Sequence, residues 1–530
     1  MLRLLTIDFD AKTVQSQQTR ANLTWGSWFL LILGLSGILS LLVLRSGPNT
    51  SLIAFLIYIV GAVVILYEPR FGIYLTLTLA LMGDSILMPA YPFVKNFSSA
   101  ESLLYLNDAI IISPLETYLV LIFISWLGRL AMKRNLSFYV GQLFWPTMAF
   151  FAFILFGFFY GLSVGGDLNI ALWESRPIFY LPVMLVLVSN LITERKHINN
   201  LIWAIMLGLF IEGLSGLYYI FVKLSVPLSQ VNEITEHGAA IHMNTVFVLV
   251  VAVWIYKGSL TKRILIPLMS LPVVLTYIAT QRRAAFLTLA IAFMLMIVVL
   301  YKENRRAFWL IIPPMAFLGL FYIGIFWNVD SAIGLPAQAI KAALFPSQAS
   351  AADASSDLYR VLENINSNFT IHIKPLTGVG FGNKFYKIVA LPDISFFTFY
   401  EYITHNSIMW IWMKAGVGGF LTMIFLIGYT IMVGVRVLWR MPGGDLSAIA
   451  LMAMLYIIMH FLYAYVDMSW DIQSMLYIGA MVGILNNFEY VVSKSVPLPN
   501  KRWPWQPNPV PEPTILPLFG KDKKSQIKRS

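Results

Sequence analysis

Two adjacent arginines, Arg282 and Arg283, stand between two uncharged and largely apolar runs, 264–279 and 284–300. One helix over both runs would be about 55 Å long at 1.5 Å per residue, whereas the hydrocarbon core of a bilayer is only about 30 Å thick. The chain must therefore turn at the arginines. Neighbouring guanidinium groups repel each other, and each costs roughly 2.5–3.5 kcal/mol at the centre of a bilayer. Such a pair is typical of a site for a phosphate or pyrophosphate, which forked arginines bind well.

Arg176 is a second candidate for binding an anion. It lies directly before Pro177 in the stretch SRPIFY, and proline is tolerated in the first turn of a helix. Arg176 is therefore expected to be the outermost residue of a membrane span. Taken alone, it is explained more simply as an arginine that reaches the lipid headgroups or that pairs with Glu174.

His405 is the candidate for proton transfer. It opens the stretch THNSIMWIWMKAGVGGF, in which a loop passes into an apolar helix, and Thr404 or Asn406 is suited to cap that helix. A histidine side chain changes charge near neutral pH, and at a helix start it reaches both water and the protein interior, which suits a general base. A lone histidine there is more often structural, so a catalytic role depends on the arginines and the long loop that His405 ends.

The other titratable residues indicate weaker sites. His237 and His242 lack the spacing of helical metal ligands, and the chain has no cysteine, so neither a metal site nor thiol chemistry is predicted. Asp84 and Glu212 lie in apolar segments, where an isolated acid is a functional candidate, although hydrogen bonding between helices explains it equally well. No cofactor is predicted.

The composition is that of a polytopic membrane protein, because 58% of the residues are hydrophobic and only 12% are charged. Apolar segments of the length that a tilted helix needs predict an all-α transmembrane helical bundle of about 14 spans. These segments are 27–44, 51–67, 71–88, 114–130, 143–162, 177–192, 199–222, 242–256, 264–280, 284–300, 307–327, 406–435, 446–463 and 471–488.

The basic residues orient these spans. With the N-terminus inside, both tails and the basic short connections fall on the cytoplasmic side, and together they carry most of the Lys and Arg, as the positive-inside rule requires. Topology thus explains the net charge of +11, and no nucleic-acid partner is predicted. The same orientation places the turn at Arg282 and Arg283 on the outer side, where basic residues are otherwise avoided.

Five regions follow from these assignments. They are a cytoplasmic N-terminal tail (1–26), a transmembrane bundle (27–327), a long periplasmic or extracellular loop (328–404), C-terminal transmembrane helices (405–490) and a Pro-rich basic cytoplasmic tail (491–530).

The long outer loop is the region best suited to hold a site. Its segments SAIGLPAQAIKAALF and SSDLYRVLENINSNF have the spacing of short amphipathic helices. The glycines of TGVGFGN are expected to form a tight turn against the membrane surface. No internal repeat of fixed period is evident, which disfavours the inverted-repeat transporters.

In combination, these motifs resemble the O-antigen ligase and O-antigen polymerase family of bacterial membrane glycosyltransferases. The resemblance covers roughly 170–440 and rests on SRPIFY, QRRAAF, YRVLEN, KPLTGVGFGN and THNSIMWIWMKAGVGG, in this order and on one side of the membrane. It implies that Arg176 and Arg283 bind the donor's pyrophosphate and that His405 is the catalytic base.

Three further residues are substrate-binding candidates: Arg282, Arg360 in YRVLEN, and Asn406. Within the arginine pair, Arg283 is preferred because two small residues follow it, as they follow the family's arginine. The family commonly has a small polar residue before that arginine, so the presence of Arg282 leaves the division of labour open.

The activity implied by the resemblance is transfer of a glycan from a polyprenyl-pyrophosphate carrier to an acceptor hydroxyl, on a glycan or a lipid, at the outer face of the bacterial cytoplasmic membrane. Pyrophosphate is a good leaving group, so the arginines would stabilise its charge while His405 takes the acceptor's proton. Attack opposite the leaving group would invert the anomeric centre, without a metal or a nucleotide. Membrane lipids are the other expected partner.

Alternatives stay open at this point. A polysaccharide polymerase of the same family would use the same donor and base, so only the acceptor groove separates it from the ligase that we favour slightly. A transporter or flippase for lipid-linked glycans fits the span count, but it predicts ionisable residues near the bilayer midplane, whereas here the unusual charges gather at one face. A non-catalytic scaffold requires that the arginines and His405 be dispensable.

Single-cysteine variants test the topology without background labelling, because the chain contains no cysteine. A cysteine at Gln281 is expected to react with a membrane-impermeant maleimide added to intact cells, since this turn is assigned to the outer side. A cysteine at Ser259, in a cytoplasmic connection, is the matched control and should react only after permeabilisation. The reverse pattern would contradict the topology and the site assignment together.

Overall fold

The structure is a computed structural model that describes residues 50–84, 86–91, 93–132, 137–225, 234–236, 238–329, 334–345, 351–394, 397–441, 443–495 and 515–517. The expected N-terminal tail (1–26), the expected span at 27–44, His237 and most of the expected C-terminal tail lie outside the described residues.

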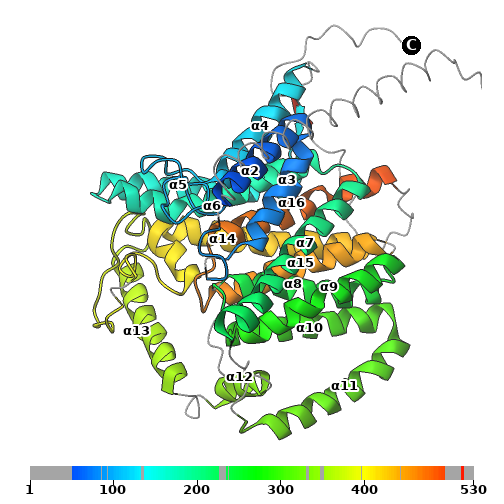
Figure 1. Ribbon diagram of the computed structural model, residues 1–530. Coiled ribbons are helices and arrows are strands. Elements are labelled where there is room, and N and C mark those ends of the chain that lie inside the picture. The colour runs from blue at the N-terminus through cyan, green and yellow to red at the C-terminus, as the bar shows by residue number, and fades with distance from the viewer. Residues whose placement is uncertain are drawn as a thin grey trace, which may run out of the picture.

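Helices dominate the described part of the chain (Figure 1). In chain order the elements are α2 (Thr50–Tyr67), α3 (Pro69–Met82), α4 (Pro114–Met132), β1 (Ser137–Tyr139), α5 (Phe144–Ser163), α6 (Leu168–Leu191), α7 (Arg195–Tyr218), the π-helix η1 (Tyr219–Leu224), α8 (Ala239–Ile255), α9 (Leu260–Ala279), α10 (Arg283–Glu303), α11 (Arg305–Phe326), α12 (Leu335–Leu344), α13 (Ala351–Ile373), α14 (Ser407–Arg440), α15 (Asp445–Ala464), α16 (Ile472–Ser495) and β2 (Ile515–Pro517). The two short strands pair antiparallel, with Phe138 opposite Leu516.

Eleven of the described helices are long and apolar enough to cross a membrane, with α7 and η1 taken as one, and α3 and α8 are shorter apolar helices. Each span expected from residue 51 onward coincides with one of these helices. The all-α polytopic bundle is therefore confirmed for the described residues. The turn at the arginine pair is confirmed as well, because α9 ends at Ala279 and α10 begins at Arg283.

The helices at the centre of the bundle are buried, whereas those at its periphery expose apolar side chains. In α15 and α16, 83% of the most apolar window is buried inside the protein, whereas no residue of α11 is buried. Figure 1 shows α15 between α8 and α14, while α11 stands apart at the lower right. Helices α16 and α6 lie along each other, as do α14 and α5. Helix α15 is apolar on all sides because neighbours surround it.

Two expected boundaries are wrong. Helix α6 begins at Leu168 instead of residue 177, because the Asp167 side chain caps it by accepting from the N–H of Ile170 (2.9 Å). Pro177 and Pro182 lie inside this helix, so Arg176 is in its third turn and is not the outermost residue. Helix α3 ends at Met82 instead of 88, and the Asp84 carboxylate accepts from the N–H groups of Ile86 and Leu87 in the turn that follows.

Helix α14 is broken near its start, and the glycine turn of the long loop fills the break. Gly416 has φ 67° and ψ −173°, which interrupts the helical ladder. The N–H of Val379 donates to the carbonyl oxygen of Met413 (2.7 Å), and the N–H of Val417 donates to the carbonyl oxygen of Pro375 (3.1 Å). The loop thus bonds backbone groups that the break would otherwise leave unpaired.

The glycines are required by this close approach, and the tight turn expected of them is present. A Cβ atom on Gly378 would lie 2.2 Å from the carbonyl oxygen of Met413, and Gly378 has φ +69°, a left-handed conformation. A Cβ on Gly161 of α5 would lie 2.1 Å from the carbonyl oxygen of Phe381. The turn is packed between α5 and α14, inside the protein.

A buried ion pair holds this turn in place. Glu174 of α6 and Lys414 of α14 lie 2.8 Å apart, and both side chains are completely buried. The Glu174 carboxylate also accepts from the N–H of Gly382 (2.7 Å), and the Lys414 ammonium donates to the carbonyl oxygen of Asn383 (2.6 Å). The pair therefore links two helices and the glycine turn. Glu174 is not the partner of Arg176, contrary to one interpretation of the sequence.

Breaking this pair is predicted to destabilise the protein strongly. Glu174→Gln and Lys414→Met should each lower the free energy of unfolding by about 3–5 kcal/mol, because each leaves a buried charge uncompensated. The double variant should lose less than the sum of the two single losses. Thermal unfolding of the purified variants in detergent measures the loss of stability in each single variant and in the double variant.

The matched control is the solvent-accessible pair of Lys384 and Glu401 in the long loop. Lys384→Met should leave the unfolding midpoint nearly unchanged, because solvent screens this contact. Additive losses for Glu174→Gln and Lys414→Met would show that the two buried groups do not stabilise each other.

Candidate functional site

Helix α13 organises the candidate site, and its inward face is polar. The buried polar residues Glu363, Asn366 and Thr370 follow helical spacing along this face. Asn366 Oδ1 accepts from the N–H groups of residues 388 and 389 (2.8 and 2.9 Å), and Thr370 Oγ1 accepts from the N–H of residue 386 (2.9 Å). The C-terminal half of α13 is therefore anchored to the loop backbone by side chains.

The amphipathic helix expected here is present, but its buried face is the polar one. Leu358, Val361 and Ile365 are 55%, 54% and 43% exposed. The helix also starts at Ala351, before the segment SSDLYRVLENINSNF in which it is expected. The loop it packs against offers backbone N–H groups, which only polar side chains can bond, and this selects the polar face for the interior.

His405 is held by α13. Glu363 Oε2 accepts from the backbone N–H of His405 (2.7 Å) and lies 3.0 Å from its Nδ1. An ionised carboxylate there favours the tautomer with hydrogen on Nδ1, which leaves Nε2 able to accept a proton. No described residue bonds Nε2, and the side chain is 22% exposed. This is the geometry of a base with an orienting partner.

Two neighbours complete the surroundings of the imidazole. The Tyr359 ring packs edge-on against it, with 5.6 Å between centroids, and burial raises the pKa of the Tyr359 hydroxyl. Asn406 caps α14 by accepting from the N–H of Met409 (3.1 Å), which confirms its capping role. Its buried Nδ2 has no hydrogen-bond partner among the described residues.

The two arginines of the turn point to different partners. Arg283 lies 3.4 Å from Asp357 of α13, and the same carboxylate oxygen lies 3.4 Å from Arg360, one turn further along that helix. Arg282 reaches the carbonyl oxygen of Thr235 (3.5 Å). Gln281 between the helices has φ 54°, so the backbone reverses within the turn.

The charges of Arg282 and Arg360 both act on Tyr463 at the end of α15, so these two arginines share one region. Tyr463 in turn donates to Asp467 (2.9 Å). Helix α13 thus brings Arg283, Arg360 and His405 to one place, with Arg282 on the side nearer α15. Arg283 and His405 are 122 positions apart in the sequence.

Arg176 is placed elsewhere. Its guanidinium forms a two-pronged contact with the Glu116 carboxylate of α4 and donates to Asn96 (3.1 Å). Tyr180, one turn along α6, donates to the same carboxylate. None of these partners belongs to the group around His405, so the structure does not join Arg176 to the other candidates.

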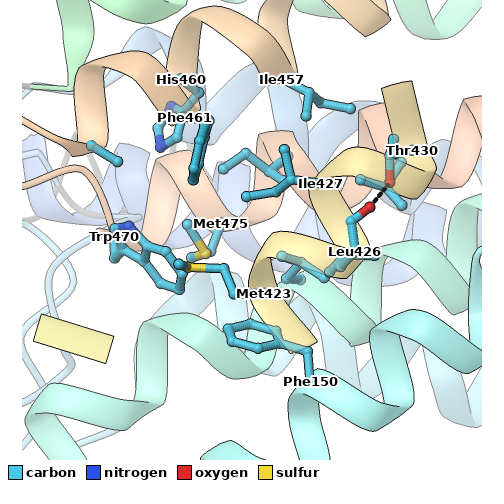
Figure 2. A pocket seen from close by; sticks show the side chains of 14 residues that line it. Phe150, Met423, Leu426, Ile427, Thr430, Ile457, His460, Phe461, Trp470 and Met475 are labelled. Atoms are coloured by element: carbon cyan, nitrogen blue, oxygen red, sulfur yellow. Dashed lines mark hydrogen bonds between the residues drawn. The ribbon is translucent and has the colours of Figure 1, made fainter. Parts of the chain in front are cut away.

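A small apolar cavity of about 50 Å³ lies between α5, α14, α15 and α16 (Figure 2). Its walls include Phe150, Met423 and Trp470, and His460 stands at the edge. The Nε2 atom of His460 lies 2.7 Å from the carbonyl oxygen of Ser469. The lining suits hydrocarbon and offers no charge to an anion.

Sequence reasoning missed the acids that contact the candidate residues, namely Asp357 and Glu363 at the site around His405, and Glu116 beside Arg176. One signal was available for the first two: on a helix through SSDLYRVLEN, positions 357, 360 and 363 are three residues apart and share a face. Nothing local in the sequence indicates Glu116. Among the described residues, no group of three His, Asp or Glu side chains is placed to hold a metal ion.

Residues 268–424 match the protein family described as O-antigen ligase. This segment contains the arginine turn, helix α13, the glycine turn and His405, whereas Arg176 lies before it. No curated protein matches the chain.

Proposed function

Because this chain carries an O-antigen ligase domain over residues 268–424, we propose that it is a membrane glycosyltransferase that moves a glycan from a polyprenyl-pyrophosphate carrier to an acceptor hydroxyl. The observation that carries this proposal is the contact of Glu363 with Nδ1 of His405, on the helix that also holds Arg360 beside Arg283. Glu363, which holds the proposed base, and Arg360 of the proposed anion site then stand one helical turn apart on α13.

The reaction follows from this arrangement. The acceptor oxygen attacks the anomeric carbon, and the bond from that carbon to the pyrophosphate oxygen breaks, with its electron pair leaving on the carrier pyrophosphate. His405 Nε2 takes the acceptor's proton, and Glu363 stabilises the imidazolium that forms. Arg283 and Arg360 neutralise the growing charge of the leaving group. Attack opposite the leaving group inverts the anomeric centre, and this scheme needs neither a metal nor a nucleotide.

The remaining candidates take supporting roles in the proposal. Arg282 adds positive charge beside the anion site, and the Nδ2 of Asn406 is a donor for a substrate oxygen next to His405. Arg176 stays a candidate for the donor, and its pairing with Glu116 means that a pyrophosphate must compete with that carboxylate. The proposed location is the bacterial cytoplasmic membrane, with the site facing outward and lipids around the bundle.

The transporter alternative gains two observations from the structure. A buried ion pair and a broken helix are features of secondary transporters. Here, however, the break at Gly416 is filled by the glycine turn, and the pair of Glu174 and Lys414 closes that contact. These features therefore fit a rigid scaffold that holds a site better than a transporter that changes conformation to move its substrate. The transferase remains the better supported function.

Replacing the proposed base is predicted to stop transfer without stopping donor binding. His405→Ala should lower kcat by about 100- to 10,000-fold, the usual contribution of a general base. Glu363→Gln should give a smaller loss of kcat with little change in KM for the donor, because it disturbs only the orientation of the imidazole. Single-turnover assays with purified protein measure both.

Glu401→Gln is the matched control, because this loop carboxylate bonds lysines instead of His405. It should leave kcat nearly unchanged. Wild-type turnover by a stably folded His405→Ala protein would refute the role of the base.

The products distinguish a ligase from a polymerase. We propose the ligase, so a lipid-linked repeat unit given as sole substrate should not react until a separate lipid or glycan acceptor is added. Gel analysis of the glycans after incubation with purified protein measures this. A ladder of longer glycans still attached to the carrier would establish the polymerase instead, and no consumption of the donor under any condition would exclude both.

A further inference from the structure

One carboxylate lies between two arginines of the candidate anion site. A single oxygen of Asp357 is 3.4 Å from a guanidinium nitrogen of Arg283 and 3.4 Å from one of Arg360. Charge-assisted hydrogen bonds of full strength are about 2.7–2.9 Å long. Both contacts are therefore long, and neither uses the two-pronged geometry that a guanidinium offers.

The acid is also the most exposed member of the group. The Asp357 side chain is 51% exposed, whereas those of Arg283 and Arg360 are 26% and 27% exposed. Solvent screens a carboxylate in such a position, so its contacts contribute little to stability. The guanidinium groups of Arg283 and Arg360 are thus largely buried, whereas the Asp357 carboxylate that bridges them is half exposed to solvent.

Arg360 is not saturated by this acid. The Nε–H of Arg360 is buried and has no hydrogen-bond partner among the described residues. A pyrophosphate, with several charged oxygens, can bond both forks at once and can reach donors that a single carboxylate leaves unused.

We propose that Asp357 stands in for the donor's pyrophosphate when the site is empty, so that the donor binds by displacing this carboxylate from Arg283 and Arg360. The inference rests on the proposed function, because it takes the pyrophosphate of the carrier as the ligand. The structure thereby assigns Arg283 and Arg360, rather than Arg283 and Arg176, as the pair that share one anion.

This exchange leaves the base undisturbed. The C-terminal half of α13 is fixed by Asn366 and Thr370, and Glu363 holds His405. Asp357 lies one and a half turns before Glu363, at the end of the helix that these bonds do not hold. The Asp357 contact sets how readily the donor enters, and the Glu363 contact sets the orientation of the imidazole.

Binding of undecaprenyl pyrophosphate to purified full-length protein in detergent tests the proposal. Asp357→Asn should bind this probe roughly two- to fivefold more tightly than the unmodified protein, since it removes a competing charge worth at most about that factor. A residue that merely positions the arginines would give the opposite result, because its loss would loosen them and weaken binding. Equal or weaker binding by Asp357→Asn therefore overturns the proposal.

Two controls isolate the mechanism. Asp108→Asn removes an equal charge from the loop before α4, where Asp108 accepts from the Tyr105 hydroxyl (3.0 Å), and should leave affinity for the probe unchanged. In an Arg360→Gln background the gain from Asp357→Asn should shrink, because one of the two contacts is already gone. An equal gain in that background would show that Asp357 acts through general charge alone.

The outcomes separate this inference from the proposed function. If the protein transfers glycan and binds the probe, but Asp357→Asn gives no gain, the stand-in role fails and the transferase stands. If neither the unmodified protein nor Asp357→Asn binds the probe, a pyrophosphate donor is excluded and both proposals fail.

Discussion

Buried backbone groups must find hydrogen bonds inside the protein, and this constraint shapes the region around His405. Helix α14 breaks at Gly416, and the backbone of residues 375–379 supplies the missing partners. A loop that elsewhere would lie in water is thereby pinned into the bundle. The ion pair of Glu174 and Lys414 is tied to the same turn, so two buried charges and a broken helix form one structural unit.

That unit fixes the position of the following loop residues and, through them, of helix α13 and His405. The loop continues to residues 386–389, whose N–H groups anchor α13 through Asn366 and Thr370. Helix α13 then holds His405 through Glu363, at the capped start of α14. His405, the proposed base, is thus fixed from two directions. Rigid placement of this kind is what general-base catalysis requires, because small displacements of a reacting group are costly.

The anion side of the site is held differently. Arg283 and Arg360 both contact the half-exposed Asp357 at 3.4 Å, while Arg282 reaches the carbonyl oxygen of Thr235. A firmly held proposed base beside two arginines that share one exposed carboxylate fits a reaction in which the leaving group carries the charge. The apolar cavity near Trp470 and the exposed surface of α11 belong to the part of the protein suited to hydrocarbon.

The sequence by itself determined the spans, the turn at Arg282 and Arg283, the capped start of α14 and the family of residues 268–424, because hydropathy, helix length and capping are local properties. It did not determine the partners. Glu363 lies 42 positions from His405, and Glu116 lies 60 positions from Arg176. The sequence also misplaced the start of α6, because Pro177 before an apolar run is typical of the first residue of a helix. Only the tertiary structure decided which charges meet, because pairing across helices depends on how their faces pack, and apolar spans can pack in many ways with the same hydropathy.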